Sequence, residues 1–170
     1  LLSVAEDARP IIAIDLASAQ FQGAVVNLRG SICHEVTLPA EGLSGDEALA
    51  LVYELIDTLL QSTQRPVLGL GTGSPGLLDT KSGVVRRAVN LSGQDLPLGN
   101  LLQTRYALPV YVANDCQAAA LAEHIFGNGR DARSLVLMKV GHGVGAGVVL
   151  DGHLFQGDGF GAGEIGHVTV

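Results

Sequence analysis

The chain is poor in basic residues, and this scarcity limits what it can bind. Its 170 residues include 10 Lys and Arg against 17 Asp and Glu, for a formal net charge of −7. Proteins that hold nucleic acid by its phosphates need a surplus of Lys and Arg on the contact surface. We therefore expect that this segment does not grip DNA by itself and that any DNA-reading part lies elsewhere.

Long apolar runs and paired cysteines are missing as well. The chain has no run of about eighteen apolar residues and no secretory leader, so we expect no membrane span and a cytoplasmic location. Its two cysteines, Cys33 and Cys116, lack C-x-x-C spacing. This favours reduced thiols in the core over a disulfide or a local zinc site.

A strand-rich opening is followed by alternating helices and strands. We expect strands over 10–16, 21–28, 31–38, 67–70 and 109–112, and helices over 46–61, 98–106 and 115–126. The first helix has an apolar stripe at helical intervals, and Ser44 and Glu47 before and within it have capping-box spacing. The opening strands predict an antiparallel meander, and the whole order predicts an α/β domain, a mixed sheet flanked by helices.

A second set of strands follows residues 127–131, which have the composition of a linker. Strands over 134–140, 144–150 and 153–155 would repeat the opening meander, with Asp151-Gly152 as a hairpin turn. We therefore expect a linker or tail at 1–9, a complete first lobe at 10–127 and the start of a truncated second lobe at 128–170. Residues 167–170 read as the beginning of a further strand.

Convergent polar residues indicate a ligand cleft. Asn114 and Asp115 stand at an expected helix start, and Glu164 and His167 lie three apart. Such groups hold the hydroxyls of a sugar. Alternatively, the first pair only caps its helix. The second pair has the spacing of metal ligands, but carboxylate-bridged two-metal bundles need a second such pair and further carboxylates on long helices, which the chain lacks.

A dinucleotide site is an alternative for the glycines of residues 71–76. They read G-x-G-x-x-G, with Asp95 about twenty residues further on. That fingerprint should open a helix at the pyrophosphate, whereas residues 77–83 read as strand and turn. We therefore do not expect dinucleotide binding.

Several motifs together resemble the ROK family, which comprises repressors and sugar kinases. They are Gly73-Ser74-Pro75-Gly76, Val89-Asn90-Leu91 with Leu96-Pro97-Leu98, residues 109–115, and Gly163-Glu164-Ile165-Gly166-His167. The resemblance covers nearly the whole chain from Pro10 onward. It implies the actin-like ATPase (ribonuclease H-like) fold, in which a ligand sits between two lobes.

The resemblance also implies roles for single residues. Sugar contacts would come from Gly76, Asn90, Asn114, Asp115, Glu164 and His167. In a kinase, Asp115 would be the catalytic base that takes the proton from the attacking sugar hydroxyl. His167 would also bind zinc, but only with cysteines beyond this chain, so we expect no cofactor within the chain and zinc only in the full-length protein.

The sequence departs from the kinases of this family at both phosphate loops. Kinases carry D-x-G-G-T after the first strand, where backbone without a Cβ approaches the phosphates. Here Asp15 is followed by Leu16-Ala17-Ser18-Ala19, and the second loop reads Gly141-His142-Gly143 instead of G-T-G. The added bulk and the missing hydroxyls argue against bound ATP and Mg²⁺.

These features predict the sugar-effector-binding domain of a ROK-type repressor. The effector would be a sugar or sugar phosphate, and DNA would be bound by a separate N-terminal domain of a full-length homo-oligomer. The alternative is an ATP-dependent, glucokinase-like hexose kinase that uses Asp115 as base. The altered phosphate loops make an enzyme the less favoured outcome.

Overall fold

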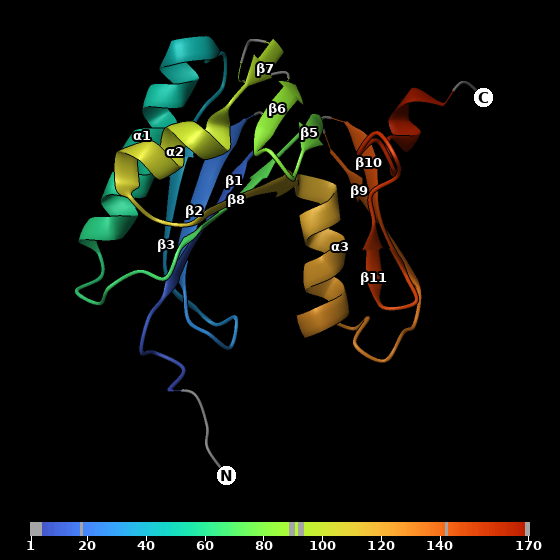
Figure 1. Ribbon diagram of the computed structural model, residues 1–170, viewed down its shortest axis with the longest axis horizontal. Helices are drawn as coiled ribbons and strands as arrows, with labels where there is room; N and C mark the ends of the chain where they lie inside the picture. The colour runs from blue at the N-terminus through green and yellow to red at the C-terminus, as the bar shows by residue number, and fades with distance from the viewer. Residues whose placement is uncertain (1–4, 18, 89–90, 92–93, 142, 169–170) are drawn as a thin grey trace.

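The computed structural model describes residues 5–17, 19–88, 91, 94–141 and 143–168. Its main sheet has five strands in the order β3-β2-β1-β4-β8 (Figure 1). The antiparallel meander consists of β1 (Ile11–Leu16), β2 (Gln20–Val26) and β3 (Ile32–Pro39). Next to β1, β4 (Leu70–Ser74) and β8 (Val110–Asn114) pair in parallel. The predicted meander and mixed sheet are confirmed.

Helices lie on both faces of this sheet. α1 (Gly45–Gln61) and α2 (Leu98–Tyr106) cover one face, and α3 (Asp115–Phe126) lies on the other (Figure 1). Leu55 and Leu59 of α1 are fully buried, and burying a leucine contributes about 1.5–3 kcal/mol. None of the helices in the described part of the chain is both long and apolar enough to span a lipid bilayer.

Two smaller antiparallel sheets complete the fold. One consists of β5 (Leu77–Asp79), β6 (Val84–Arg87) and β7 (Gln94–Leu96). The other consists of β9 (Leu135–Val140), β10 (Val144–Leu150) and β11 (His153–Phe155). The second sheet packs on α3, which therefore lies between it and the main sheet (Figure 1). The proposed division into lobes at 127/128 stays a prediction.

The structure corrects the prediction around the glycines of residues 69–76. The strand expected at 67–70 is β4, which starts at Leu70 and contains Gly71, Thr72 and Gly73. Pairing with β1 on one side and β8 on the other outweighs the low strand propensity of glycine. Because β4 is followed by the strand β5, these glycines open no helix. The dinucleotide site, the alternative that the sequence already disfavoured, is therefore wrong.

Three local expectations also need correction. Ser44 is the N-cap of α1, but its side chain makes no capping hydrogen bond to any described residue, so the capping box does not form. His167 ends a short 3-10 helix, η1 (Ile165–His167), rather than beginning a strand. Cys33 is exposed on the edge strand β3, which no described strand covers, whereas Cys116 is buried as expected.

Candidate functional site

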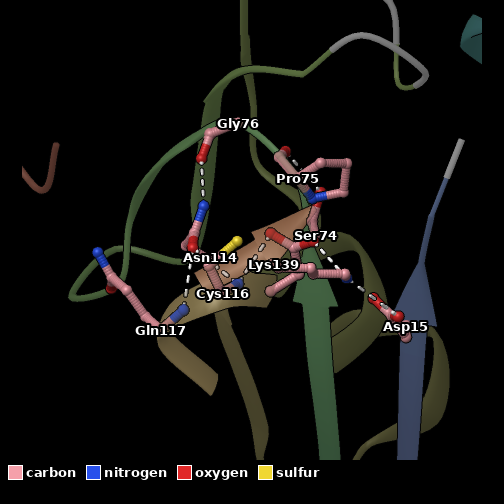
Figure 2. A network of polar contacts seen from close by, with 9 residues as sticks. Asp15, Ser74, Pro75, Gly76, Asn114, Cys116, Gln117 and Lys139 are labelled. Atoms are coloured by element: carbon pink, nitrogen blue, oxygen red, sulfur yellow. Dashed lines mark hydrogen bonds and ion pairs between the residues drawn. The ribbon is translucent and has the colours of Figure 1, made fainter. Parts of the chain in front are cut away.

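The carboxylates of Asp15 and Asp115 meet at one edge of the main sheet. Asp15 is near the end of β1 and Asp115 directly follows β8, with β4 between them. Because these strands run parallel, their carboxyl ends share an edge, where open α/β sheets bind ligands. Lys139 of β9 joins the two carboxylates: its Nζ lies 2.7 Å from Asp115 Oδ2 and 3.8 Å from Asp15 Oδ2. Figure 2 shows Lys139 pointing toward Asp15.

The three charged groups differ in their surroundings. The Asp115 side chain is 12% exposed, whereas those of Asp15 and Lys139 are 41% and 42% exposed. Burial raises the pKa of Asp15; Lys139 offsets part of the rise, and the charge of Asp115 adds to it. Burial alone would lower the pKa of Lys139, but its hydrogen bond to Asp115 and the attraction of both carboxylates raise it. Lys139 is therefore protonated at neutral pH.

A cavity of about 530 Å³ adjoins these charges, in the size range of small-ligand sites. Its walls carry small side chains from the sheet and from α3, among them Ala13, Ala113 and Ala118. Asp15 Oδ1 and Thr72 Oγ1 belong to lining residues, are buried, and have no hydrogen-bond partner among the described residues. Buried polar atoms normally have a partner, so these two oxygens are an exception beside the cavity.

Asn114 is held by three hydrogen bonds within the protein. Its Oδ1 accepts from the backbone N–H groups of Cys116 and Gln117 at 3.0 and 3.1 Å, which makes it the N-cap of α3. Its Nδ2 donates to the carbonyl oxygen of Gly76 at 3.0 Å (Figure 2). The capping alternative is therefore present in the structure. A sugar contact by Asn114 stays a prediction.

Gly76 occupies a position that only glycine fits. Its φ is +96°, and an added Cβ would collide with the carbonyl oxygen of Arg87 on β6. The turn after β4 is thus held against the β5–β7 sheet and, through the Gly76 carbonyl, against the start of α3. Its sugar contact stays a prediction, and Asn90 lies outside the described residues.

Glu164 and His167 pair with each other around η1. His167 Nε2 lies 3.8 Å from Glu164 Oε2, and the His167 side chain is 86% exposed. Among the described residues, no hydrogen bond or ion pair joins either side chain to Asp115. The charge of Glu164 does act at the start of α3: burial raises the pKa of the Cys116 thiol to about 11, and Glu164 is a minor contributor.

His167 does not make a zinc site with the residues described. Structural zinc takes four protein ligands, and the described ranges hold no group of three or more side chains placed to bind a metal ion. The described residues therefore do not form a zinc site by themselves. Zinc in the full-length protein stays a prediction.

The altered phosphate loops follow β1 and β9, the strands that carry Asp15 and Lys139. After β1, Ala17 is half-buried and Ala19 is exposed. After β9, Gly141 and Gly143 are exposed, with no described atom within 4 Å of an added Cβ. Ser18 and His142 lie outside the described residues, so the structure tests only part of both loops.

The family assignment follows from comparison with known proteins. The ROK family model matches residues 11–170. The chain belongs to the ROK family. It is 36% identical over 174 residues to the xylose repressor of Caldicellulosiruptor bescii, covering 100% of this chain and 44% of that protein. It is 35% identical over 163 residues to the glucokinase of Thermotoga maritima, covering 94% of this chain and 50% of that protein.

A solved structure confirms the predicted actin-like ATPase fold for this ROK chain. A ROK family transcriptional regulator, a homologue of the Escherichia coli Mlc protein, superposes with a TM-score of 0.87 at 30% identity. The match covers 96% of this chain and 42% of that one. The chain thus spans about half the length of the relatives it matches.

Lys139 of this ROK chain was missed by the sequence analysis, although the sequence contains a signal for it. Along β9, half-buried and exposed side chains alternate, and Lys139 shares the half-buried face with Leu135 and Leu137. A charged residue on the inward face of a strand needs a partner. That rule predicts a carboxylate facing β9, but it does not identify which Asp or Glu provides it.

A network of uncharged side chains was missed as well. Gln117 of α3 is 1% exposed; its Nε2 donates to the carbonyl of Phe160 at 3.3 Å, and its Oε1 accepts from Gln156 at 3.4 Å. Gln156 Nε2 also donates to Thr80 Oγ1 at 3.2 Å. The segment after β11 is thereby tied to α3 and to the end of β5. Isolated glutamines carry no sequence pattern that predicts such contacts.

Proposed function

We propose that this ROK domain binds a sugar or sugar-phosphate effector within a transcriptional repressor. The observation that carries the proposal is the Asp115–Lys139 ion pair at the edge of the cavity. The Asp115 carboxylate can accept hydrogen bonds from sugar hydroxyls. Its charge is compensated by Lys139, a side chain of the protein itself. Asp15, whose side chain is 41% exposed, offers a second carboxylate beside it.

The names of the relatives support sugar handling but do not separate the two functions. A xylose repressor and a glucokinase match at 36% and 35% identity. The phosphate loops favour the repressor, because Ala17 and Ala19 stand where kinases have glycine and threonine. We further propose that DNA is bound by a separate N-terminal domain, and that the full-length protein is a cytoplasmic homo-oligomer.

Calorimetric titration of the full-length protein with a sugar panel tests this proposal. The panel contains xylose and other pentoses, common hexoses, N-acetyl sugars and the phosphates of each. We expect one sugar class to bind with no nucleotide present. Failure of every sugar to bind would contradict the effector proposal.

A sugar kinase is the second candidate, because Asp15 and Asp115 are both retained and face the same sheet edge. A coupled assay of ADP release, with Mg²⁺-ATP and the same sugar panel, tests it. Sugar-dependent turnover that Asp115→Asn abolishes would establish the kinase with Asp115 as its base. We expect no turnover above that of the protein-free control.

A further inference from the structure

The sheet edge has a positive charge where its carboxylates would otherwise form a cation site. Asp15 and Asp115 offer carboxylate oxygens, the ligands that Mg²⁺ and Ca²⁺ prefer. Lys139 Nζ is 2.7 Å from Asp115 Oδ2 and 3.8 Å from Asp15 Oδ2. A divalent ion between these atoms would lie against the ammonium group, and the two positive charges would repel. The residues present therefore do not fit a magnesium ion here.

The packing of β10 on α3 fixes the lysine in this place. Lys139 on β9 pairs directly opposite Gly145 on β10. A Cβ added to Gly145 would lie 2.7 Å from Cys116 Sγ, so the missing side chain lets the β9–β11 sheet approach the first turn of α3. Asp115 is the first residue of that turn. The lysine and its nearest carboxylate are thus brought together where the backbone of Gly145 packs against the Cys116 side chain.

We propose that Lys139 is a built-in cation, which takes the place of a divalent metal between Asp15 and Asp115. The ammonium group compensates the charge of the two carboxylates and holds Asp115 in one orientation at the cavity edge. The cleft then offers Asp115 to a ligand without any metal. Only the consequence for sugar recognition rests on the proposed function; the exclusion of metal does not.

Binding of Mn²⁺, followed by electron paramagnetic resonance on the full-length protein, tests this inference without a sugar. We expect no Mn²⁺ bound to the wild-type cleft. Lys139→Met keeps a long side chain and removes the charge, so it should bind Mn²⁺ at least about tenfold more tightly than wild type. Adding Asp115→Asn to Lys139→Met should abolish the gain.

Two controls assign the gain to the charge at this position. Lys139→Arg keeps a positive charge and should bind no Mn²⁺, and Lys81→Met, at an exposed lysine of the β5–β6 turn, should behave as wild type. Equal Mn²⁺ affinity in wild type and Lys139→Met, when both melt as folded proteins, would overturn the inference.

Anomalous diffraction from wild-type crystals soaked in MnCl₂ gives a second measurement that needs no variant. We expect no manganese peak between Asp15 and Asp115, and a peak there would overturn the inference even if Lys139→Met did not fold. Sugar titration in EDTA separates the two proposals. Sugar binding in EDTA together with a manganese peak would retain the effector proposal and overturn the built-in cation. No sugar binding together with no manganese peak would overturn the effector proposal and retain the built-in cation.

Discussion

Asn114 and Asp115 are neighbours in sequence and both accept a hydrogen bond from the backbone N–H of Cys116, yet their other partners differ. Asn114 is 7% exposed and bonds to α3 and to Gly76, whereas Asp115 bonds to Lys139 beside the cavity. Asn114 has the extended backbone of an N-cap residue, whereas Asp115 begins the helix. The sequence pattern selected both residues but did not show that Asn114 caps α3 while Asp115 pairs with Lys139.

Asp115→Asn should weaken sugar binding, because the variant cannot make the charge-assisted hydrogen bond to a hydroxyl. Such bonds contribute about 1.5–3 kcal/mol, which corresponds to roughly a 10- to 100-fold weaker affinity. Titration calorimetry with the sugar that the panel identifies measures the change. Asp131→Asn, at an exposed aspartate, is the matched control and should bind as wild type. Unchanged affinity in Asp115→Asn would remove Asp115 from the sugar site.

Asn114→Ala should lower the free energy of unfolding by about 1–2 kcal/mol, the usual cost of removing an N-cap side chain. Ser44→Ala is a matched control, because Ser44 is also an N-cap but makes no side-chain cap bond to a described residue. It should change stability by less than about 0.5 kcal/mol. Urea denaturation of both variants measures the difference, and equal destabilisation would mean that the Asn114 bonds do not stabilise α3.

At the scale of elements, the glycines after β9 have two kinds of surroundings. Gly141 and Gly143 are exposed with open space around them, whereas Gly147 lies against α3. A Cβ on Gly147 would collide with the carbonyl oxygen of Cys116 and with Ala120 Cβ. The glycine-rich run after β9 resembles a phosphate loop in its first half. In its second half, the missing side chain of Gly147 lets β10 pack on α3.

Gly147→Ala should consequently destabilise the protein by about 1–3 kcal/mol, the cost of overpacking a close contact. Gly143→Ala adds the same methyl group in open space and should change stability by less than about 0.5 kcal/mol. Thermal unfolding of both variants provides the comparison. Similar melting temperatures for the two would show that β10 can move away from α3 without cost.

The long periodic elements could be predicted from the sequence, and the short paired ones could not. α1 carries its own apolar stripe, so its bounds differ from the prediction by one residue. The length of β4 depends on its pairing with β1 and β8 on either side. β6 and β7 pair with each other, but their sequences have no repeating pattern of apolar residues. Such strands depend on partners, which local sequence does not specify.

The residues of the candidate site also differ in how far the sequence could predict them. Asp115 was found because a helix start is visible in sequence, and Asp15 because the resemblance to ROK kinases aligns it with their first phosphate loop. Lys139 comes from another sheet, and its contact depends on how closely β10 approaches α3, a distance that no single segment determines. Glu164 and His167 were placed correctly near each other, but their distance from Asp115 could not be inferred from spacing.

At the scale of the whole molecule, ionised Asp15 should cost stability at neutral pH. Its pKa is raised above 3.8 in the folded protein, so between 3.8 and that higher value the folded state binds more protons, and stability falls as pH rises through this window. Asp15→Asn should raise the melting temperature at pH 7, with no gain at pH below 3.8. The gain should stay below about 1 kcal/mol, because Asp15 is 41% exposed and solvent screens its charge. A lower melting temperature at pH 7 would contradict this assignment.

We propose, as the central claim, that this chain keeps the sugar side of a ROK cleft while its phosphate side is replaced. Each hydrogen bond to a phosphate oxygen that the altered loops cannot make is worth roughly 1.5–3 kcal/mol, so the absence of two lowers nucleotide affinity by about 10² to 10⁴. The most direct test is calorimetric titration of Mg²⁺-ATP into full-length protein saturated with its sugar. We predict no measurable heat of nucleotide binding. Micromolar Mg²⁺-ATP affinity would contradict the claim and restore the kinase.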